Sequence, residues 1–418
     1  MKILIVSRSF PFFPGEQFLE TEIIYWESTP FTEVIVAPET ADKRDAARPL
    51  PPSIKLDTTL LSEKDQSKWA LRAILSPHFF REILSLISLQ RYRISALPQA
   101  LREVARLLRS YAGLRKILES DPEITVIYTY WNSSASYASV LLKQQGLIDR
   151  VVSRIHRFDL YEERAKGGHI PLKRRFGGNF DSLFALSPQA RNYLINRFNI
   201  PKEIVHVNRL GVEVPDSISF ATPASEVHLV SVSYCLVVKR IDRIILALEE
   251  FGRQRPELTI RWTHIGDGPL LKELEELAFR TLRRRPNISF QFLGNLRNDQ
   301  VRSYYLENSV DFFVNVSESE GTPVAIMEAM AAGVPTIAPD VGGISDLVAP
   351  ATGFLLNGKF DENELVAAFE TMSYESKKTH VRTAAKRLVE SKFNARVNYP
   401  GFIKDVFPGS SLSSYEKI

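Results

Sequence analysis

The chain has 418 residues, of which 44% are hydrophobic and 24% charged, with a formal net charge of +4. This length exceeds one ordinary core and fits two domains, and the composition excludes a fibrous or disordered protein. No apolar run approaches transmembrane length, and a lone cysteine, Cys235, excludes an internal disulfide and fits a reducing cytoplasm. No Cys/His cluster has metal-ligand spacing, so we expect no metal site.

Short apolar strands alternate with helical stretches through both halves of the chain. The predicted strands are 3–7, 33–37, 125–130, 151–156, 182–187 and 205–210, then 229–233, 259–265, 289–294, 309–317, 336–338 and 353–356. This alternation predicts α/β architecture, with two doubly wound domains that have parallel sheets and helices on both faces. Two such domains leave a cleft at the carboxyl ends of both sheets, where a ligand should bind.

The loop after the first predicted strand lacks Gly-x-Gly-x-x-Gly. Residues 7–16 instead form a longer loop rich in Pro and Phe that contains Gly15. A dinucleotide-dependent oxidoreductase would hold its pyrophosphate at this turn, so the sequence disfavours that class.

The segment 66–117 is strongly basic, with ten basic and two acidic residues. Its helical period places Arg102, Arg106 and Arg109 on one face. Two interpretations remain open: a solvated helix surface, or docking to an anionic membrane face or a phosphorylated lipid.

In the second half, the first strand runs into Lys239 and Arg240. Cations at the end of a parallel strand can neutralise a diphosphate, but Lys and Arg are also commonly exposed before a helix. Both interpretations stay open.

The segment from Glu320 to Pro335 reads as a turn, a helix and a stop. The strand 309–317 precedes it, Thr322 suits the N-cap, Pro323 suits the first helical position, and Gly333 ends the helix. Free N–H groups at such a helix start form an anion site.

Two carboxylates, Glu320 and Glu328, lie eight residues apart across this helix start. The neighbours of Glu328 are apolar, so we expect a buried carboxylate whose hydrogen-bond donors are ligand hydroxyls, rather than a solvated helix glutamate. Glu320 either contacts the ligand or complements the helix dipole.

Taken together, these segments resemble the retaining glycosyltransferases of family 4, which have the GT-B fold. The most specific part is the pattern Glu320-Gly321-x-Pro323-x-x-x-x-Glu328, continued to Pro335. Residues 265–269, 292–294, 341–343 and 353–355 support it, and the runs 128–161, 209–212 and 238–242 look like bacterial polysaccharide-building members.

The resemblance implies roles for individual residues. Glu328 would bind the ribose hydroxyls and Glu320 the donor sugar near the reacting carbon. Lys239 would neutralise the diphosphate, and His156 would contact the far hydroxyls of the sugar. The remaining candidates for donor binding are Gly15, whose loop approaches the donor, the segment Gly321, Thr322, Pro323 and Val324, which holds sugar and phosphate, and Leu293, near the base.

Two positions depart from the family pattern. Tyr234 stands where many relatives carry arginine, so either Arg240 supplies the second charge or the diphosphate is held less strongly. Asp346 stands where glutamate is commoner.

With this fold, we expect an N-terminal acceptor domain at 1–213, a linker at 214–226 and a nucleotide-sugar donor domain at 227–385. Residues 386–418 should form a C-terminal helix that packs back on the first domain, followed by a flexible tail.

The expected activity is retaining transfer of a sugar from a nucleotide diphosphate sugar to a glycan or lipid-linked acceptor hydroxyl, in cell-surface polysaccharide synthesis. The catalytic residues would be Glu320, Lys239 and His156. We expect no cofactor besides the donor and no nucleic-acid partner, with a cytoplasmic location or the inner face of the cell membrane. The alternatives are a nucleotide-sugar epimerase of the same architecture and a non-catalytic, glycosyltransferase-like scaffold.

Overall fold

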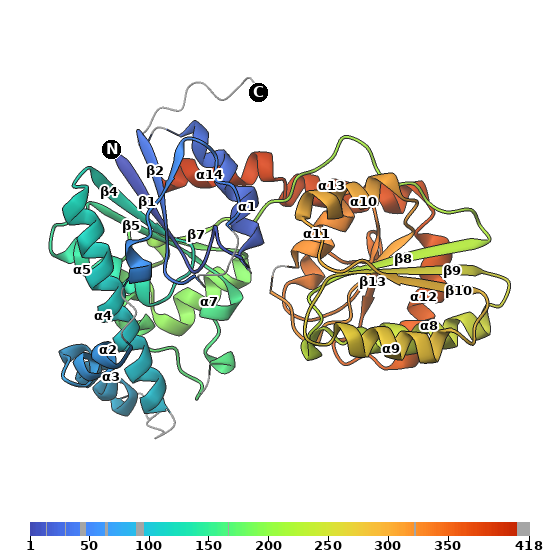
Figure 1. Cartoon of the computed structure of the whole chain (residues 1–418), viewed down its shortest axis with the longest axis horizontal. Coiled ribbons are helices and arrows are strands. Elements are labelled where there is room, and N and C mark those ends of the chain that lie inside the picture. The colour runs from blue at the N-terminus through green and yellow to red at the C-terminus, as the bar shows by residue number, and fades with distance from the viewer. Residues whose placement is uncertain are drawn as a thin grey trace. The chain divides into compact units, whose positions relative to one another are not determined.

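The computed structural model describes residues 1–13, 15–29, 31–41, 47–62, 66–88, 96–165, 167–321 and 323–407. The chain forms two compact units: the first comprises Met1–Arg209 and the chain from Asn398 onward, and the second comprises Leu210–Val397. Each unit has a parallel sheet between layers of helices (Figure 1). The predicted α/β architecture with two doubly wound units is therefore confirmed.

The first unit contains a seven-stranded sheet in the order β3-β2-β1-β4-β5-β6-β7. Lys2 pairs with Glu33 and Ser7 with Pro38 along the central β1–β2 ladder. The strands are β1 (Lys2–Ser7), β2 (Glu33–Pro38), β3 (Ile54–Leu56), β4 (Ile124–Thr129), β5 (Arg150–Ile155), β6 (Ser182–Ala185) and β7 (Val205–Val207). The helices are α1 (Gln17–Ile23), α2 (Gln66–Ile74), α3 (Pro77–Ser88), α4 (Leu97–Ser120), α5 (Ser134–Gln144), α6 (Lys173–Phe176) and α7 (Pro188–Phe198).

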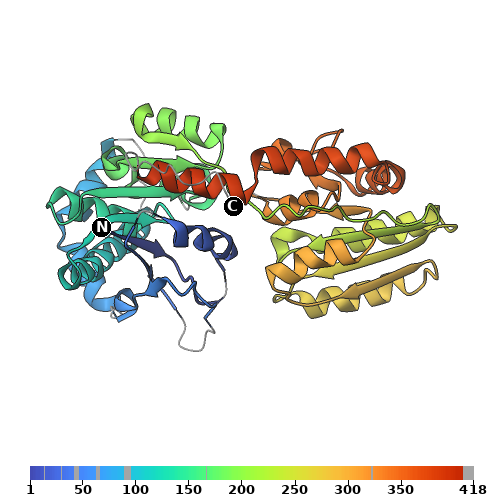
Figure 2. The same cartoon turned by 90° about the horizontal axis from the view of Figure 1, so that it is seen from above.

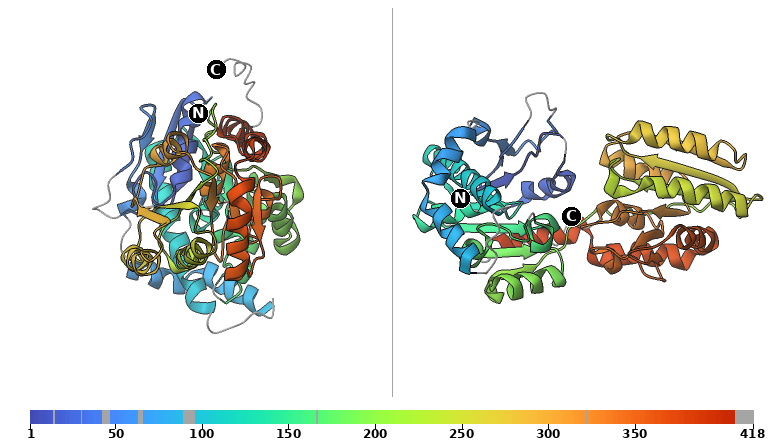
Figure 3. Two further views of the ribbon diagram at one scale, coloured as in Figure 1. Left: turned by 90° about the vertical axis from the view of Figure 1, so that its right-hand side faces the viewer. Right: turned by 90° about the horizontal axis from the view of Figure 1, so that it is seen from below.

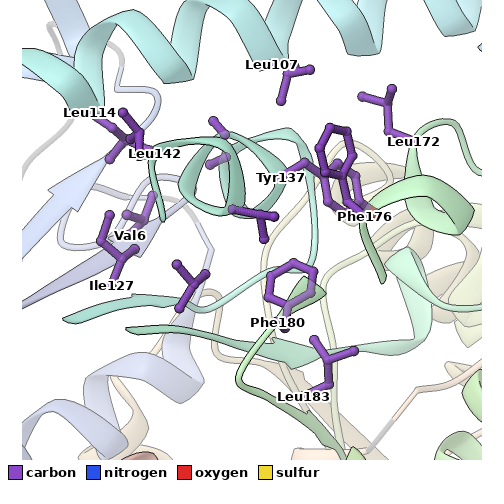
Figure 4. Close-up of a cluster of buried hydrophobic side chains, with 14 of the residues drawn as sticks. Val6, Leu107, Leu114, Ile127, Tyr137, Leu142, Leu172, Phe176, Phe180 and Leu183 are labelled. Carbon is purple, nitrogen blue, oxygen red and sulfur yellow. The ribbon is translucent and has the colours of Figure 1, made fainter. Parts of the chain in front are cut away.

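Side chains of this sheet alternate between two separate cores. Leu4 and Val6 enter a core with α4 and α5, whereas Ile3 and Ile5 enter one on the opposite face. Figure 4 shows the first core, where the side chains of α4 and α5 lie over the strands. This alternation fixes the register, because a one-residue slip would exchange the two faces.

The second unit contains a six-stranded sheet in the order β10-β9-β8-β11-β12-β13. The helices α8, α9 and α12 cover one face and α10, α11 and α13 the other (Figures 1 and 3). The strands are β8 (Glu226–Val232), β9 (Thr259–Ile265), β10 (Ile288–Phe292), β11 (Phe312–Val314), β12 (Thr336–Pro339) and β13 (Gly353–Leu356). The helices are α8 (Ile241–Gln254), α9 (Leu271–Leu282), α10 (Asn298–Glu307), α11 (Val324–Ala331), α12 (Glu362–Glu375), α13 (Thr379–Lys392) and α14 (Ala395–Val406), the last of which passes into the first unit.

Short 3-10 helices complete the described chain. They are η1 (Ile24–Ser28), η2 (Thr59–Ser62), η4 (Arg157–Asp159), η5 (Glu162–Arg164), η6 (Gly177–Asn179), η7 (Lys202–Ile204), η8 (Val237–Lys239) and η9 (Ile344–Asp346). None of the helices in the described ranges combines the length and the apolar character that spanning a bilayer requires.

Three strand predictions need correction, and one of them is the strand predicted at 205–210, which ends at Val207 as β7. The edge strand β3 was not predicted; it has three residues, two of them exposed, so it carries little apolar pattern. The strand predicted at 309–317 is shorter, because β11 pairs only over Phe312–Val314. Past β11, the side chain of Asn315 accepts a hydrogen bond from the Ser317 amide at 2.9 Å and turns the chain out of the sheet.

The segment 214–226 is held against the second unit by specific hydrogen bonds. The Thr222 amide and hydroxyl donate to the buried carboxylate of Asp311 at 3.0 and 2.6 Å. Lys377 donates to Thr222 and to Asp311 as well. Linker-like composition therefore coexists here with an ordered attachment, and β8 begins at Glu226.

The last helix, α14, reaches the first unit from Asn398 onward (Figures 1 and 2). Phe402 joins the second core of that unit and packs against Trp26 and Tyr128. The guanidinium of Arg154 lies 4.0 Å from the centroid of the Phe402 ring and donates to Glu22 at 2.7 Å, with both charged side chains fully buried.

We predict that Arg154→Met lowers the free energy of unfolding by about 3–5 kcal/mol, because it leaves the Glu22 carboxylate buried without its cation. The double variant Glu22→Leu with Arg154→Met should recover much of this loss, since it removes both charges. Unfolding in guanidinium chloride, monitored by circular dichroism, measures the free energy of unfolding of the single and the double variant. A double variant as unstable as the single one would contradict the prediction.

Candidate active site

The second sheet reverses its strand order beside β8. From β8 the chain continues through α8 to β9 on one side, and from β11 it continues through α11 to β12 on the other. The loops that follow β8 and β11 therefore diverge at the carboxyl edge of the sheet. This topological switch point is where open α/β sheets bind ligands.

These two diverging loops are tied to each other. The Glu318 amide donates to the Val238 carbonyl at 3.0 Å, which joins the loop after β11 to η8. An ion pair adds to this, since Lys239 Nζ lies 2.7 Å from Glu320 Oε1. Asn315 Nδ2 donates to the same carboxylate oxygen at 3.1 Å. The sequence placed Lys239 opposite the helix start, and the structure brings it to Glu320.

Glu320 is ionised at neutral pH. Burial by itself would raise the pKa of this carboxyl group, but the charge and the hydrogen bond of Lys239 outweigh burial and hold the pKa below its ordinary value. The side chains of Lys239 and Glu320 retain 23% and 11% of their exposure, so the pair remains accessible to a ligand.

Arg240 has a different environment from Lys239. It adopts the left-handed conformation, with φ of 49°, at the N-cap of α8. Its guanidinium donates to Glu318 at 2.6 Å and to Asp242 at 3.1 Å. Two carboxylates thus already hold the charge that was predicted for the diphosphate, and a phosphate must compete with them. Tyr234, which replaces the family arginine, is 55% exposed.

The helix α11 begins one residue later than predicted. Pro323 is the N-cap rather than the first helical residue, because its ψ of 88° lies outside the helical region, and α11 starts at Val324. The predicted cap Thr322 lies outside the described residues. Ile326 and Met327 both donate to the Pro323 carbonyl, so the amides of Val324 and Ala325 precede the first intrahelical bonds.

Glu328 is buried in α11, with 7% of its surface exposed, among apolar neighbours that are also buried. Burial raises the pKa of its carboxyl group to about 7, and the charge of Arg302 opposes this only in part. Arg302 Nη1 lies 4.0 Å from Glu328 Oε1, beyond hydrogen-bond distance. A carboxylate held this way has capacity to accept hydrogen bonds from a ligand.

Glycines allow the neighbouring loops to pack closely. Gly266 has φ of 150°, and a side chain there would come within 1.9 Å of the Ser233 carbonyl oxygen. The Leu293 amide donates to the His264 carbonyl at 2.9 Å, and the Gly266 amide donates to the Gly294 carbonyl at 2.8 Å. The Leu293 amide is therefore hydrogen-bonded within the protein. Its carbonyl and side chain are the groups that could contact the nucleobase predicted for this position.

The first unit contains the other predicted residues, Gly15 and His156. Gly15 has φ of 103°, and the next residue, Glu16, also has a positive φ of 53°. The buried carboxylate of Glu16 accepts hydrogen bonds from the Arg8, Ser9 and Phe10 amides and from Trp131 Nε1, at 2.6–2.9 Å. Glu16 therefore closes the loop that contains Gly15, and Trp131 links this loop to His156.

His156 is a buried, neutral imidazole. Burial, with a contribution from Arg154, lowers its pKa to about 3. Its ring lies 4.4 Å from the Trp131 ring and 4.7 Å from the Tyr130 ring, centroid to centroid. Nε2 lies 3.1 Å from the Tyr130 carbonyl, which assigns the proton to Nε2, and the same side chain accepts from the Asp159 amide in the capping box of η4.

The structure thus assembles the predicted residues in two groups. Lys239, Glu320 and α11 with Glu328 lie at the carboxyl edge of the second sheet, and the Gly15 loop and His156 lie together in the first unit. Three residues that were not predicted from the sequence also lie in these groups, namely Glu16, Asn315 and Arg302. Asn315 follows the apolar run of β11 directly, the position at which a polar residue is expected to face a ligand.

Comparison with known proteins agrees with this geometry. Residues 228–373 match the family model described as glycosyl transferases group 1.

Two curated relatives illustrate the range of the similarity. The sulfoquinovosyl transferase SQD2 of Arabidopsis thaliana is 30% identical over 160 residues, which are 37% of this chain and 29% of the relative. The putative colanic acid biosynthesis glycosyltransferase WcaL of Escherichia coli is 24% identical over 277 residues, 63% of this chain and 66% of the relative. The chain spans only 25–31% of the length of the first four curated relatives that it matches.

Solved structures match the fold over nearly the whole chain. The lipopolysaccharide outer core galactosyltransferase WaaB has a TM-score of 0.67 at 15% identity, covering 97% of this chain and 99% of that one. HepE of Anabaena, solved with UDP and glucose, has a TM-score of 0.63 at 16% identity, with the same two coverages. These likenesses identify the fold as GT-B, and residues 228–373 of the second unit are those that match the glycosyl transferases group 1 model.

We predict that Glu328→Gln raises the free energy of unfolding at pH 8 by about 3 kcal/mol and changes it little at pH 4. The folded protein holds the Glu328 proton up to a pKa of about 7, whereas the ordinary value is 4.5, so wild-type stability falls as pH rises between these values. Urea unfolding at both pH values measures this, with exposed Glu307→Gln as the control. A variant less stable than wild type at pH 8 would show that the carboxylate is satisfied within the protein.

Proposed function

We propose that the chain is a retaining glycosyltransferase that moves a sugar from a nucleotide diphosphate sugar to a hydroxyl of a glycan or lipid-linked acceptor. Colanic acid and amylovoran biosynthesis transferases among its relatives support a role in cell-surface polysaccharide synthesis. HepE, with its bound UDP, supports a uridine nucleotide as the first donor to test.

The observation that carries this proposal is the pairing of Lys239 with Glu320 beside the start of α11, with Glu328 buried in the same helix. A nucleotide sugar has three parts that need different partners. Its diphosphate needs cations and N–H groups, its ribose needs a hydrogen-bond acceptor, and its sugar needs polar contacts near the reacting carbon. The diphosphate would be met by Lys239 and the first amides of α11. The ribose would be met by Glu328, and the sugar by Glu320.

In the reaction, negative charge grows on the leaving diphosphate while positive charge grows on the sugar ring. Lys239 and the amides of Val324 and Ala325 stabilise the diphosphate as fixed donors, without reorganisation during the step. The ionised Glu320 holds Lys239 in place and adds negative charge beside the sugar. Such a donor set stabilises the leaving group without a metal, and we infer that the enzyme needs none.

Retention follows in this proposal from attack on the same face that the diphosphate leaves. The acceptor hydroxyl then gives its proton to a leaving phosphate oxygen, which becomes more basic as the bond to the sugar breaks. His156, a neutral imidazole in the first unit, would contact a hydroxyl of the donor sugar. The anomeric configuration of donor and product, read by NMR, tests retention directly.

We predict that Lys239→Ala lowers kcat/KM for sugar transfer by about 10²–10³-fold, the range for losing one fixed donor to a developing oxyanion. Donors are first found by thermal shift across UDP-, GDP-, ADP- and CDP-sugars, since a ligand at about one hundred times its Kd stabilises by about 2.7 kcal/mol. Lys272→Ala, at an exposed lysine of α9, is the matched control. Release of free epimerised sugar in the absence of an acceptor would instead indicate an epimerase. If the wild-type protein turned over no donor, it would be a non-catalytic scaffold.

We also predict that donor affinity rises about tenfold between pH 6 and pH 8, because ribose hydroxyls bind the ionised Glu328, whose pKa is about 7. The diphosphate of a nucleotide sugar is fully ionised over this range, so the change reports the protein. Calorimetric titration of the wild type and of Glu328→Gln with the donor, at both pH values, measures the part of the pH dependence that comes from Glu328. The variant should bind weakly with no pH dependence, and an equal pH dependence in both proteins would remove Glu328 from the donor site.

A further inference from the structure

The helices α2 and α3 have two apolar faces each, of which only one is buried. Trp69 and Ala73 of α2 and Leu86 of α3 are buried, and both helices pack against α4. The opposite faces are exposed at Leu71 and Ile74 of α2 and at Phe80, Leu84 and Ile87 of α3, and Leu75, directly after α2, is exposed too, with exposed fractions of 45–74%. Figure 1 shows this helix pair beside one end of α4.

The spacing shows that these six side chains form continuous stripes. Phe80, Leu84 and Ile87 follow the i, i+4, i+7 pattern of one helix face. Leu71 and Ile74 follow i, i+3 on α2, and Leu75 comes directly after this helix. An exposed apolar group of this size, concentrated on one helix pair, marks an interaction surface.

The charges on the pair are of one sign at the surface. Lys68, Arg72 and Arg81 are exposed, and Arg72 lies with its guanidinium 5.0 Å from the centroid of the Trp69 ring. Within 66–88 the acidic residue is Glu82, which is buried. Its carboxylate lies 2.6 Å from His169 Nε2 and accepts from the Leu172 amide at 3.1 Å, which anchors α3 to the body of the first unit.

A basic hollow lies between α2 and α4. It is lined by Arg72, Arg115 and Lys116 together with Trp69 and Tyr111, and by one carboxylate, Glu119, which pairs with Arg115 at 2.7 Å. Cationic and aromatic side chains of this kind suit the headgroup region of a bilayer, where anionic phosphates meet the apolar interior.

The sequence predicted a basic surface over 66–117, with Arg102, Arg106 and Arg109 on one face of a helix. Of these three, Arg102 and Arg106 are exposed on α4. In the structure Arg106 pairs with Glu103 at 2.7 Å and Arg109 is only partly exposed, and Arg91 and Arg93 lie outside the described residues. The exposed apolar side chains are on α2 and α3 instead.

We propose that α2 and α3 dock on an anionic bilayer, with their exposed apolar stripes inserted among the lipids and Lys68, Arg72 and Arg81 at the headgroups. Charge complementarity selects this occupant. A second copy of the chain would bring the same positive residues face to face across a symmetric interface, whereas an anionic lipid surface matches them. This inference deepens the proposed function, because a lipid-linked acceptor would be reached at such a surface.

Co-flotation with vesicles tests the proposal on the full chain without any donor, so it can fail independently of the transferase activity. Wild type should float with vesicles of phosphatidylglycerol and phosphatidylcholine, and much less with phosphatidylcholine alone. Phe80→Glu with Leu84→Glu should lower the bound fraction by roughly tenfold or more. Arg72→Gln with Arg81→Gln should weaken binding about fivefold for each charge removed.

The control is Phe279→Glu on α9, since Phe279 is 57% exposed and Phe80 56%. This variant should float like wild type, and circular dichroism should show that all variants are folded. Wild-type protein that does not float, or a Phe80→Glu and Leu84→Glu variant that floats unchanged, would overturn the proposal. Dimers in sedimentation that these substitutions dissociate, without vesicle binding, would assign the surface to a second copy and overturn it too.

Discussion

The contact between Lys239 and Glu320 joins two loops that the second sheet sends in opposite directions. Parallel strands place both loops at one edge, and the reversal of strand order beside β8 separates them. The ion pair, with the Glu318 amide on the Val238 carbonyl, holds the cation close to the start of α11. Without this contact, the positive end of the helix and the lysine would form two separate weak anion sites.

The two carboxylates of α11 and its preceding turn are buried to similar extents but differ in pKa. Lys239 and Asn315 keep Glu320 ionised, whereas Glu328 has only a distant cation and a pKa of about 7. Environments that separate two carboxyl groups in this way assign them different tasks. Glu320 carries a charge at neutral pH, and Glu328 is, in the proposed function, the acceptor for ligand hydroxyls. The cost of Glu328 to stability is the kind that function commonly imposes on a binding site.

Much of this arrangement follows from the sequence, for identifiable reasons. Parallel sheets follow from the alternation of strands and helices, and the burial of Glu328 follows from its apolar neighbours. The end of β11 does not, because it depends on the bond between the Asn315 side chain and the Ser317 amide. The closure of the Gly15 loop by Glu16 is also hidden, since Trp131, one of its donors, is distant in sequence. The exposed stripes of α2 and α3 required knowledge of which faces α4 covers.

The state of His156 constrains the chemistry of the proposed reaction. A base with a pKa of about 3 accepts a proton poorly at neutral pH, whereas efficient general bases have a pKa near the working pH. In the proposed reaction, His156 is therefore a contact for a sugar hydroxyl and not a general base. Glu320 is held ionised by Lys239, which also makes it a weak base. The leaving phosphate oxygen becomes more basic as its bond to the sugar breaks, so in this proposal it takes the proton of the acceptor hydroxyl. The leaving group therefore assists attack on the same face of the sugar from which it departs.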